Sequence, residues 1–285
     1  DFGLALTACS KSHQWPQALQ LLAVLRSQEV EEDLLLLNAA MSACGRAKKW
    51  QHALVLFINT LDVDEMALTA AIAACSSFWQ QSLGLLNLLP KRMLSSTLLT
   101  HTPAVRSCGD ASQWEWAVHL LRDLQQHVTA DAILYTTAIN ACSHDRTDAL
   151  DLQLNQCSLW PYALSLFSEM DSSLCDGIAY TAAISSCGKA NEWQHSLALL
   201  RQSQQAMIQG DSTTYVAAIS ACKKSSNGWQ QACHLFSTMP HAKVEPNIIN
   251  YNAVLSACER GDAWQQALSL LETMPHSRIE PDTVT

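Results

Sequence analysis

A tryptophan-centred phrase recurs eight times along this chain of 285 residues. In each copy a small residue stands three positions after the tryptophan, and in seven copies a leucine or valine follows it. The tryptophans are Trp15, Trp50, Trp79, Trp114, Trp160, Trp193, Trp229 and Trp264. A cysteine stands upstream of every copy, at Cys9, Cys44, Cys75, Cys108, Cys142, Cys187, Cys222 and Cys258. Self-similarity with a period near 35 predicts one small unit repeated along the chain.

The segment 177–211 shows what one unit is. Tyr180, Ala183, Ile184 and Cys187 recur at helical spacing, and Gly188 begins a stretch of turn-forming residues. A second helix is expected from Trp193, so that the unit is a helix hairpin. Neither helix can bury its apolar face alone, and stacking the next hairpin buries it. We therefore expect an all-α solenoid in which each tryptophan packs between hairpins, although a tryptophan could also stack on a base.

The eight units are expected to form a single array over residues 1–285. Their approximate bounds are 1–33, 34–64, 65–97, 98–131, 132–176, 177–211, 212–247 and 248–282. The chain begins and ends inside a unit, so we expect it to be part of a longer chain. About twelve extra residues between Cys142 and Trp160 predict a surface insertion in the fifth unit. The third and fourth units are degenerate, and Pro103 is expected near the start of a helix, where proline is tolerated.

The eleven cysteines do not indicate a disulfide framework. Eight occupy one position of the repeat, which places them about one repeat apart and too far from each other to bridge easily. No C-x-x-C pair is present. The pattern favours small buried apolar residues in a reducing compartment. No run of apolar residues is long enough to span a membrane.

The residues of the last unit resemble a known family. The stretch 249–258, the stretch 266–274 and the ending Ile279-Glu280-Pro281-Asp282 are similar to the pentatricopeptide repeat, and 244–247 is similar to its ending. The tetratricopeptide signature, with its tryptophan in the first helix, is missing. The resemblance covers essentially the whole chain and is closest in the last four units. It implies a right-handed superhelical solenoid of about eight repeats whose units each bind one base of single-stranded RNA.

The resemblance also implies which residues read the bases. A polar residue in the first turn of the first helix would act with the closing residue of the unit. The first-turn residues are Asn38, Thr69, Thr102, Thr136, Thr181, Val216 and Asn252. The closing residues are Asp64, Asp131, Asp176, Asp211, Asn247 and Asp282, with Thr97 in the degenerate third unit. Ile133, Ile178, Thr213 and Ile249 would press on the face of a base.

Two explanations of these polar residues remain open. A hydroxyl or amide with a neighbouring carboxylate can pair with a base edge. The same residue types beside a helix start are also ordinary capping residues. By the family's code, the threonine–aspartate pairs imply G at the fourth, fifth and sixth units, and the asparagine–aspartate pairs imply U at the second and eighth. Val216 cannot form a hydrogen bond through its side chain and breaks the code.

The formal net charge of −9 argues against generic affinity for nucleic acid. A cation nevertheless stands two residues after five of the recurring cysteines, at Lys11, Arg46, Lys189, Lys224 and Arg260. The resemblance implies that these residues contact phosphate, and a helix C-terminus also favours a cation through its dipole. Ser77 and Asp110 occupy the same position without a positive charge.

We find no catalytic motif, and we predict that the chain is not an enzyme and needs no cofactor or metal. The prediction is sequence-selective binding of single-stranded RNA in organellar RNA processing, stability, editing or translation, in a chloroplast or mitochondrion by resemblance. Effector proteins are the other expected partners, and no membrane is involved. The alternative is a helical-repeat scaffold that binds proteins and no RNA.

Overall fold

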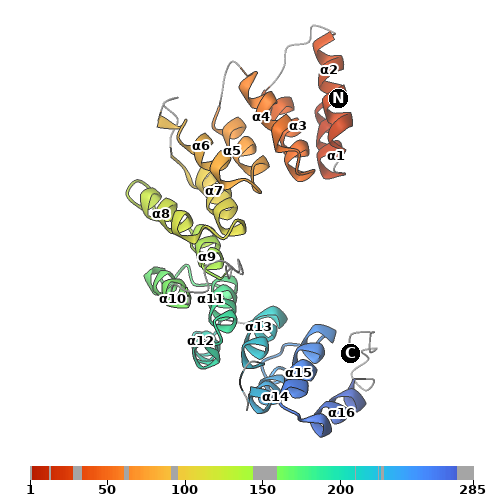
Figure 1. The fold of residues 1–285 in the computed structure, drawn as a ribbon, viewed down its shortest axis with the longest axis vertical. Helices are drawn as coiled ribbons and strands as arrows, with labels where there is room; N and C mark the ends of the chain where they lie inside the picture. Colours follow the sequence, from red (N-terminus) through yellow and green to blue (C-terminus); the bar gives the residue numbers. More distant parts are fainter. Residues whose placement is uncertain are drawn as a thin grey trace, which may run out of the picture. The chain divides into compact units, whose positions relative to one another are not determined.

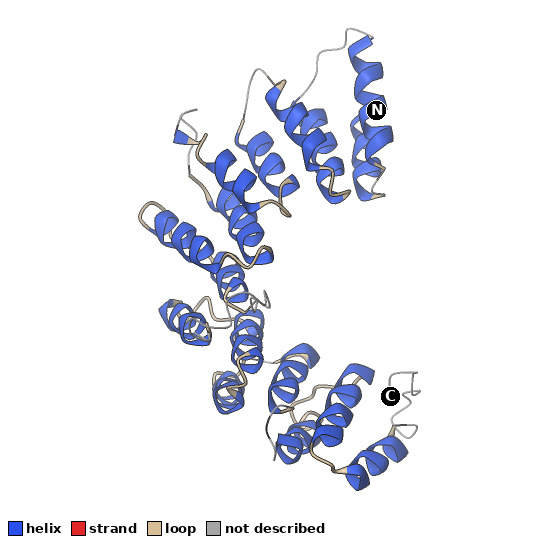
Figure 2. Ribbon diagram, viewed as in Figure 1, coloured by secondary structure: helices blue, strands red, loops and turns tan. Residues whose placement is uncertain are grey.

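A computed structural model describes the chain except for residues 1, 13, 28–33, 61–63, 91–95, 144–158, 209, 224, 226–227 and 275–285. All regular structure among the described residues is helical, in sixteen helices (Figures 1 and 2). Eight are first helices of hairpins: α1 (Phe2–Lys11), α3 (Leu34–Arg46), α5 (Glu65–Ala74), α7 (Leu98–Asp110), α9 (Ala132–Ala141), α11 (Gly177–Lys189), α13 (Ser212–Cys222) and α15 (Ile248–Arg260). Eight are second helices: α2 (Trp15–Ser27), α4 (Trp50–Ile58), α6 (Trp79–Leu86), α8 (Trp114–Gln125), α10 (Trp160–Glu169), α12 (Trp193–Gln205), α14 (Gly228–Thr238) and α16 (Trp264–Thr273).

The chain divides into two compact units, Asp1–Ala141 and Cys142–Thr285. The first unit contains α1 to α9, and the second contains α10 to α16. Within each unit a first helix packs against the first helix of the next hairpin and against its own second helix. This arrangement is an all-α helical-repeat solenoid, as the period predicts. None of the helices among the described residues has the length and apolar character needed to cross a bilayer.

A shared turn explains the fixed spacing from cysteine to tryptophan. The carbonyl oxygens of Cys44, Cys108, Cys187 and Cys258 each accept a hydrogen bond from the amide five residues later, at 2.8–2.9 Å. The residue before that donor has a positive φ at Lys48, Ser112, Asn191 and Asp262, between 52° and 67°. The second helix begins two residues after this left-handed residue in all four turns, at Trp50, Trp114, Trp193 and Trp264. The turn therefore places each tryptophan at the start of a second helix.

Close approach between first helices is permitted by a glycine that follows three of the cysteines. A Cβ built on Gly188 would lie 2.9 Å from Cβ of Ala221 on the neighbouring α13. Gly45 meets Ala74, and Gly109 meets Ala141, in the same way. Real Cβ atoms do not approach this closely, so a side chain at these positions would push the hairpins apart.

The recurring cysteines are buried, as expected, at Cys44, Cys75, Cys108, Cys142, Cys187, Cys222 and Cys258, whereas Cys9 is half-buried. All the described cysteines are free thiols. Burial raises the pKa of the thiols of Cys75, Cys108, Cys142, Cys187 and Cys222 to about 11. These cysteines are uncharged at neutral pH and act as small apolar side chains between helices.

The recurring tryptophans contact neighbouring hairpins, as the sequence predicts, but they are less buried than a core residue. Seven of the eight are half-buried, and four contact a ring of the next hairpin: the centroid distances are 4.9 Å for Trp15–His52, 4.7 Å for Trp50–Phe78, 6.3 Å for Trp79–Trp116 and 4.6 Å for Trp160–His195. Trp264 is 66% exposed. These four tryptophans, at the starts of second helices, therefore link neighbouring hairpins through partly exposed ring contacts.

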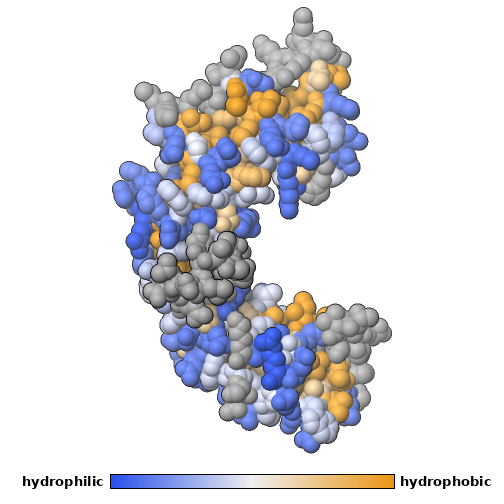
Figure 3. Space-filling view, viewed as in Figure 1, coloured by the Kyte–Doolittle hydropathy of each residue, from blue (hydrophilic) through white to orange (hydrophobic). Residues whose placement is uncertain are grey.

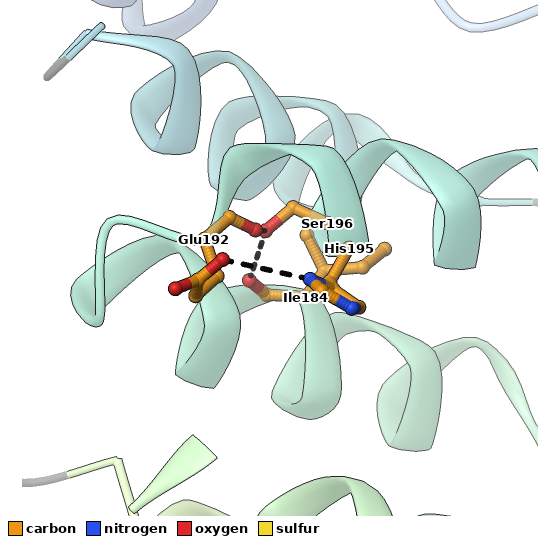
Figure 4. A network of polar contacts seen from close by, with 4 residues as sticks. All are labelled: Ile184, Glu192, His195 and Ser196. Carbon is orange, nitrogen blue, oxygen red and sulfur yellow. Dashed lines mark hydrogen bonds and ion pairs between the residues drawn. The ribbon is translucent and has the colours of Figure 1, made fainter. Parts of the chain in front are cut away.

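A serine replaces the small alanine of the tryptophan phrase in two hairpins and joins the two helices. Ser196 Oγ donates to the carbonyl oxygen of Ile184 at 3.1 Å (Figure 4). Ser82 Oγ donates to the carbonyl oxygen of Cys75 at 3.2 Å. Beside Ser196, the His195 ring lies 3.6 Å from the Glu192 carboxylate, and both groups face solvent.

One expectation about the fourth hairpin is wrong. Pro103 lies inside α7, at its sixth residue, and not in the first turn. A proline there has no N–H for the carbonyl oxygen of Leu99, and α7 nevertheless continues to Asp110. The packing of α7 against α8 and α9 maintains the helix across this missing bond. The insertion expected in the fifth unit falls almost entirely outside the described residues.

Candidate nucleic-acid interface

The predicted base-reading residues lie at equivalent places in seven first helices. Each first-turn residue is the fifth of its helix: Asn38 in α3, Thr69 in α5, Thr102 in α7, Thr136 in α9, Thr181 in α11, Val216 in α13 and Asn252 in α15. The closing residue immediately precedes the helix. Residues three apart share one face of a helix, so the second and fifth residues are one turn apart beside the cap. We call the second and fifth residues of a first helix, together with the closing residue of the same unit, which caps the next first helix, the N-terminal triad.

The closing residues cap the helices that follow them. A side-chain oxygen accepts the backbone N–H three residues later at 2.6 Å for Asp64, 2.8 Å for Asp131 and Asp176, 2.9 Å for Asp211 and 3.1 Å for Asn247. The capping explanation is therefore correct for all five. The cap occupies one carboxylate oxygen, Oδ1, in the four aspartates. Base reading by the same side chains stays a prediction, and Asp282 lies outside the described residues.

The threonines of the triads all make the same kind of hydrogen bond within their helices. The hydroxyls of Thr69, Thr102, Thr136 and Thr181 each donate to the carbonyl oxygen four residues earlier, at 2.5–2.8 Å. A hydroxyl that donates within its helix retains lone pairs that can accept from a base N–H. Thr136 is only 8% exposed, whereas Thr69, Thr102 and Thr181 are half-buried. The three half-buried threonines are thus better placed for a ligand than Thr136.

Thr181 and Asp211, which the resemblance pairs across consecutive hairpins, are joined through a third residue. Thr181 Oγ1 lies 2.6 Å from Thr214 Oγ1, to which it can donate in place of the Gly177 carbonyl oxygen, and Thr214 Oγ1 donates to Asp211 Oδ1 at 2.9 Å. Partial burial works against ionisation of Asp211, but hydrogen bonds from Thr213 and Thr214 hold its pKa below the usual value. The paired residues therefore form one polar site with an ionised carboxylate at neutral pH.

The asparagines differ from the threonines. Asn38 Oδ1 is buried without a hydrogen-bond partner, so this oxygen is not presented to solvent in this rotamer. Asn252 is half-buried. Asn247 uses its side-chain amide within the protein: Oδ1 caps α15, and Nδ2 donates to Ser212 Oγ at 2.9 Å. With Val216 as its fifth residue, the seventh hairpin offers no free hydrogen-bonding pair.

The second residue of each triad is an exposed apolar side chain in six of the seven helices. The predicted base-face residues Ile133, Ile178 and Ile249 are 65%, 68% and 58% exposed, and Thr213 is also exposed. Leu35, Met66 and Leu99 occupy the same register in the first unit and are equally exposed. They were not predicted from the sequence, because the four predicted residues each stand two places before a tyrosine, and Leu37, Leu68 and His101 take the place of that tyrosine here. Figure 3 shows exposed hydrophobic side chains on the surface of the first unit.

The predicted phosphate contacts lie at the opposite ends of the first helices. Lys11 and Arg46 in the first unit, and Lys189 and Arg260 in the second, are exposed in or at the last turn. About eight residues of helix, roughly 12 Å, separate such a cation from the fifth residue. Lys189 donates to Ser143 Oγ at 3.2 Å. Lys224 lies outside the described residues.

Lys223 is a further cation that sequence reasoning missed. Burial lowers the pKa of its ammonium group, and the nearby charge of Arg260 lowers it further, which Glu259 partly offsets. Two cations from consecutive hairpins thus lie near one another. No cluster of potential metal ligands is found among the described residues.

Comparison with protein families identifies the repeat. The pentatricopeptide repeat model matches residues 178–206 and 249–279, and a pentatricopeptide repeat domain model matches residues 198–260. The chain is a pentatricopeptide repeat protein. The matched residues belong to the second unit, where the capping aspartates and tyrosines of the repeat are best kept. No curated protein matches the sequence.

Solved structures show the same fold. The pentatricopeptide repeat protein PPR10 from maize matches all of this chain with 21% identity and a TM-score of 0.54. PPR10 in complex with an 18-nucleotide psaJ RNA element matches 99% of the chain with 12% identity and a TM-score of 0.73. The chain spans 45% and 40% of the length of these two structures. At such identities the likeness supports the helical-repeat fold of this pentatricopeptide repeat protein and nothing about its ligand.

Proposed function

We propose that this pentatricopeptide repeat protein binds single-stranded RNA along its N-terminal triads, with one base for each competent hairpin. The observation that supports this most directly is the link between Thr181 and Asp211 through Thr214. Capping of α13 requires only Asp211 and the first turn of that helix. It does not explain why the Thr181 hydroxyl, from the preceding hairpin, lies against the same cap. The PPR10–RNA complex shows that the fold accommodates an RNA strand in a relative.

The chemistry of the triad suits a base. The edge of a base requires hydrogen-bond donors and acceptors, which the threonine hydroxyl and the second carboxylate oxygen supply. The face of a base requires an apolar contact, which Ile178 supplies one turn earlier on the same helix. Stacking contacts with bases are worth about 1–3 kcal/mol each. A hairpin with all three groups can both hold a base and discriminate between bases.

The triads are not equivalent. In the fourth and sixth hairpins Thr102 and Thr181 are half-buried, and the closing residues are the aspartates Asp131 and Asp211. These hairpins support discrimination, and the family's code implies G there. The seventh hairpin has Val216 and an Asn247 that is already engaged, so it supports only a contact with the base face. We therefore expect the second unit to prefer a specified base, then an unspecified one, then U at Asn252.

The acidic composition limits affinity and makes it dependent on the cations at the other helix ends. Each phosphate neutralised on a single strand contributes about −0.7 to the slope of log affinity against log salt. With Lys11, Arg46, Lys189, Lys224 and Arg260 all engaged, the slope would be roughly −3.5. A slope near zero would mean that these residues serve only the helix dipole.

The proposed role is regulatory and not catalytic. We propose that the bound strand is masked or presented to effector proteins during RNA processing, stabilisation, editing or translation. Pentatricopeptide repeat proteins generally act in organelles, which supports a chloroplast or mitochondrial location.

The proposal is tested by selecting RNA from a randomised single-stranded pool at two salt concentrations. The expected result is enrichment of G-containing cores, with affinity falling as salt rises. Thr181→Asn should change the preference at one base from G to U, while Asp211→Asn should retain the cap of α13 and relax that preference. Thr137→Val is the matched control, because the Thr137 hydroxyl makes the same intrahelical bond at 2.6 Å outside the triad.

The outcome also separates RNA binding from the scaffold alternative. A folded, helical sample that enriches no sequence and shows no salt dependence would contradict RNA binding and favour a protein-binding scaffold. Unchanged base preference in Thr181→Asn, in a chain that does bind RNA, would refute the assignment of the triad while leaving RNA binding in place.

A further inference from the structure

One second helix departs from the tryptophan phrase in a way that neither the fold nor RNA binding uses. The fourth residue after the tryptophan is leucine or valine in seven copies, but it is Cys233 in α14. The recurring cysteine of the next hairpin, Cys258, lies in α15, which packs directly against α14. The substitution therefore places a second thiol beside a thiol that the repeat already provides.

The two sulfur atoms face each other across this helix contact. Cys233 Sγ and Cys258 Sγ are 3.8 Å apart. A disulfide requires about 2.05 Å, so the sulfurs must approach by less than 2 Å, which side-chain rotation and a small helix shift can supply. Cys233 is half-buried, and Cys258 is fully buried. Cys233 is therefore the more accessible of the two to an oxidant, and the Cys258 thiol lies next to it in the interior.

We propose that Cys233 and Cys258 form a reversible disulfide that joins the seventh and eighth hairpins when the chain meets hydrogen peroxide. In the first step the Cys233 thiolate attacks a peroxide oxygen, the O–O bond breaks, and Cys233 becomes a sulfenic acid while hydroxide leaves. In the second step Cys258 sulfur displaces the sulfenic hydroxyl group as water, and the S–S bond forms. The balance is two thiols and one peroxide giving one disulfide and two waters.

The surroundings of the two thiols determine which of them is oxidised first and how fast the oxidation is. Burial raises the pKa of both thiols, to about 12 for Cys258, and a hydrogen bond from Cys258 favours the thiolate of Cys233. Cys233 is therefore the group that reacts first, and Cys258 is the resolving thiol. Because little thiolate is present at neutral pH, oxidation is slow and needs sustained peroxide. This separates the pair from a rapid catalytic thiol.

The disulfide would act on the hairpin that contains the last described triad. The cross-link closes a loop of 25 residues and constrains the unfolded chain. It would also pin α15, which contains Ile249 and Asn252 at its start, to the preceding hairpin. Oxidation is therefore expected to slow opening of α14 and α15 whether or not RNA is bound.

The test oxidises the whole reduced chain with hydrogen peroxide at low protein concentration. Remaining thiols are then alkylated, and the chain is digested without reductant for mass spectrometry. The expected product is one cross-linked pair of peptides that contains Cys233 and Cys258 and separates on reduction. Amide hydrogen exchange in α14 and α15 should be slowed several-fold in the oxidised chain and return to its original rate after reduction.

Two variants make the result decisive. Cys233→Leu restores the residue of the other hairpins and should lose the cross-link and the protection, while its helical circular dichroism stays unchanged. Cys175→Ser removes another partly accessible thiol and should retain both. Cys233 that ends as a sulfinic acid without a cross-link, or that pairs with a cysteine other than Cys258, would overturn the proposal.

Discussion

The third and fourth hairpins, α5 to α8, and the sixth to eighth, α11 to α16, share the same fold with unequal sites. Both regions bury the recurring cysteine, and both cap a first helix with an aspartate, Asp64 in one and Asp176 in the other. The later region retains the tyrosines of the repeat and cations at the helix ends. The earlier region has Leu68 and His101 in place of tyrosine, and Ser77 and Asp110 in place of cations.

The difference teaches that packing and recognition are specified by separate positions of one repeat. Packing depends on small or apolar residues at the cysteine and second-helix positions, which persist in both regions. One hairpin of each region also keeps the glycine after the cysteine, at Gly109 and Gly188. Recognition depends on the exposed first turn and on the last turn, where substitutions cost little stability. The family models match only residues of the later region, although the hairpins continue through the earlier one.

The largest expected effect tests whether the close helix contact is common to both regions. Gly109→Leu and Gly188→Leu should each destabilise the chain by about 1–3 kcal/mol, because even the new Cβ would lie only 2.9 Å from Cβ of Ala141 or Ala221. Gly84→Ala is the control: it also replaces a glycine inside a helix, but it meets nothing within 4 Å and should stabilise by up to about 1 kcal/mol. Urea unfolding of the full chain measures all three. Tolerance of Gly188→Leu alone would show that the two regions pack differently.

Substitutions in the hairpin turns should have a smaller effect on the free energy of unfolding, and they should stabilise the chain. Lys48 and Ser112 occupy the left-handed turn position in the first unit, whereas Asn191 and Asp262 occupy it in the second. Asparagine and aspartate adopt this conformation more readily than lysine or serine, and glycine adopts it without strain. Lys48→Gly should therefore stabilise by roughly 1 kcal/mol, and Asn191→Gly by only a few tenths. Equal gains from the two substitutions, measured by thermal unfolding, would remove this distinction between the units.

Sequence reasoning located the hairpins well because packing repeats along the chain. The first helices begin at or within one residue of the expected unit starts from Leu34 onward, and the cysteines are buried as expected. The partial exposure of the tryptophans and the position of Pro103 inside α7 were not predicted. Periodicity identifies which residues recur, but it does not give the exposure of a side chain or the exact residue at which a helix begins. At the candidate site, the pattern predicted the pair Thr181 and Asp211, and their role in base reading stays a prediction. Thr214, which links them in the structure, could not be predicted because the link depends on the distance between two hairpins. Leu35, Met66 and Leu99 were missed because their tyrosine landmark is replaced.

His101 gives the fourth hairpin a pH dependence that the tyrosine-containing hairpins lack. Its ring is 3% exposed, and burial lowers its pKa, an effect that a hydrogen bond to the Thr97 carbonyl and the charge of Asp123 partly offset. The folded state therefore binds a proton less readily than the unfolded state. The contribution of His101 to the free energy of unfolding is fully present above the pKa of histidine in the unfolded chain, near 6.5. It is lost as the pH falls from there towards the lower pKa of His101 in the folded chain.

The corresponding experiment compares the wild-type chain with His101→Leu, the residue type found at the same register in α3 and α5. The melting temperature of the wild type should decline more between pH 7 and pH 5 than that of the variant, by about a degree or two. His127→Leu, which removes an exposed histidine, controls for the loss of a titrating group. Parallel curves for wild type and His101→Leu would show that the buried ring titrates equally in the folded and unfolded states.

The smallest effect concerns the missing cation of the earlier region and depends on RNA binding. Asp110 ends α7 where Arg46 ends α3 and Lys189 ends α11, so Asp110→Lys would restore the charge at that register. If the helix ends contact phosphate, the slope of log affinity against log salt should steepen by about 0.7, with a gain of several-fold in affinity at low salt. Glu115→Lys makes the same change in charge at the start of the second helix α8, away from that register, and should leave the slope nearly unchanged. An equal change of the slope in both variants would mean that only net charge matters. A steeper slope in Asp110→Lys alone would show that the earlier hairpins keep the geometry of the phosphate contact although they lack its charge.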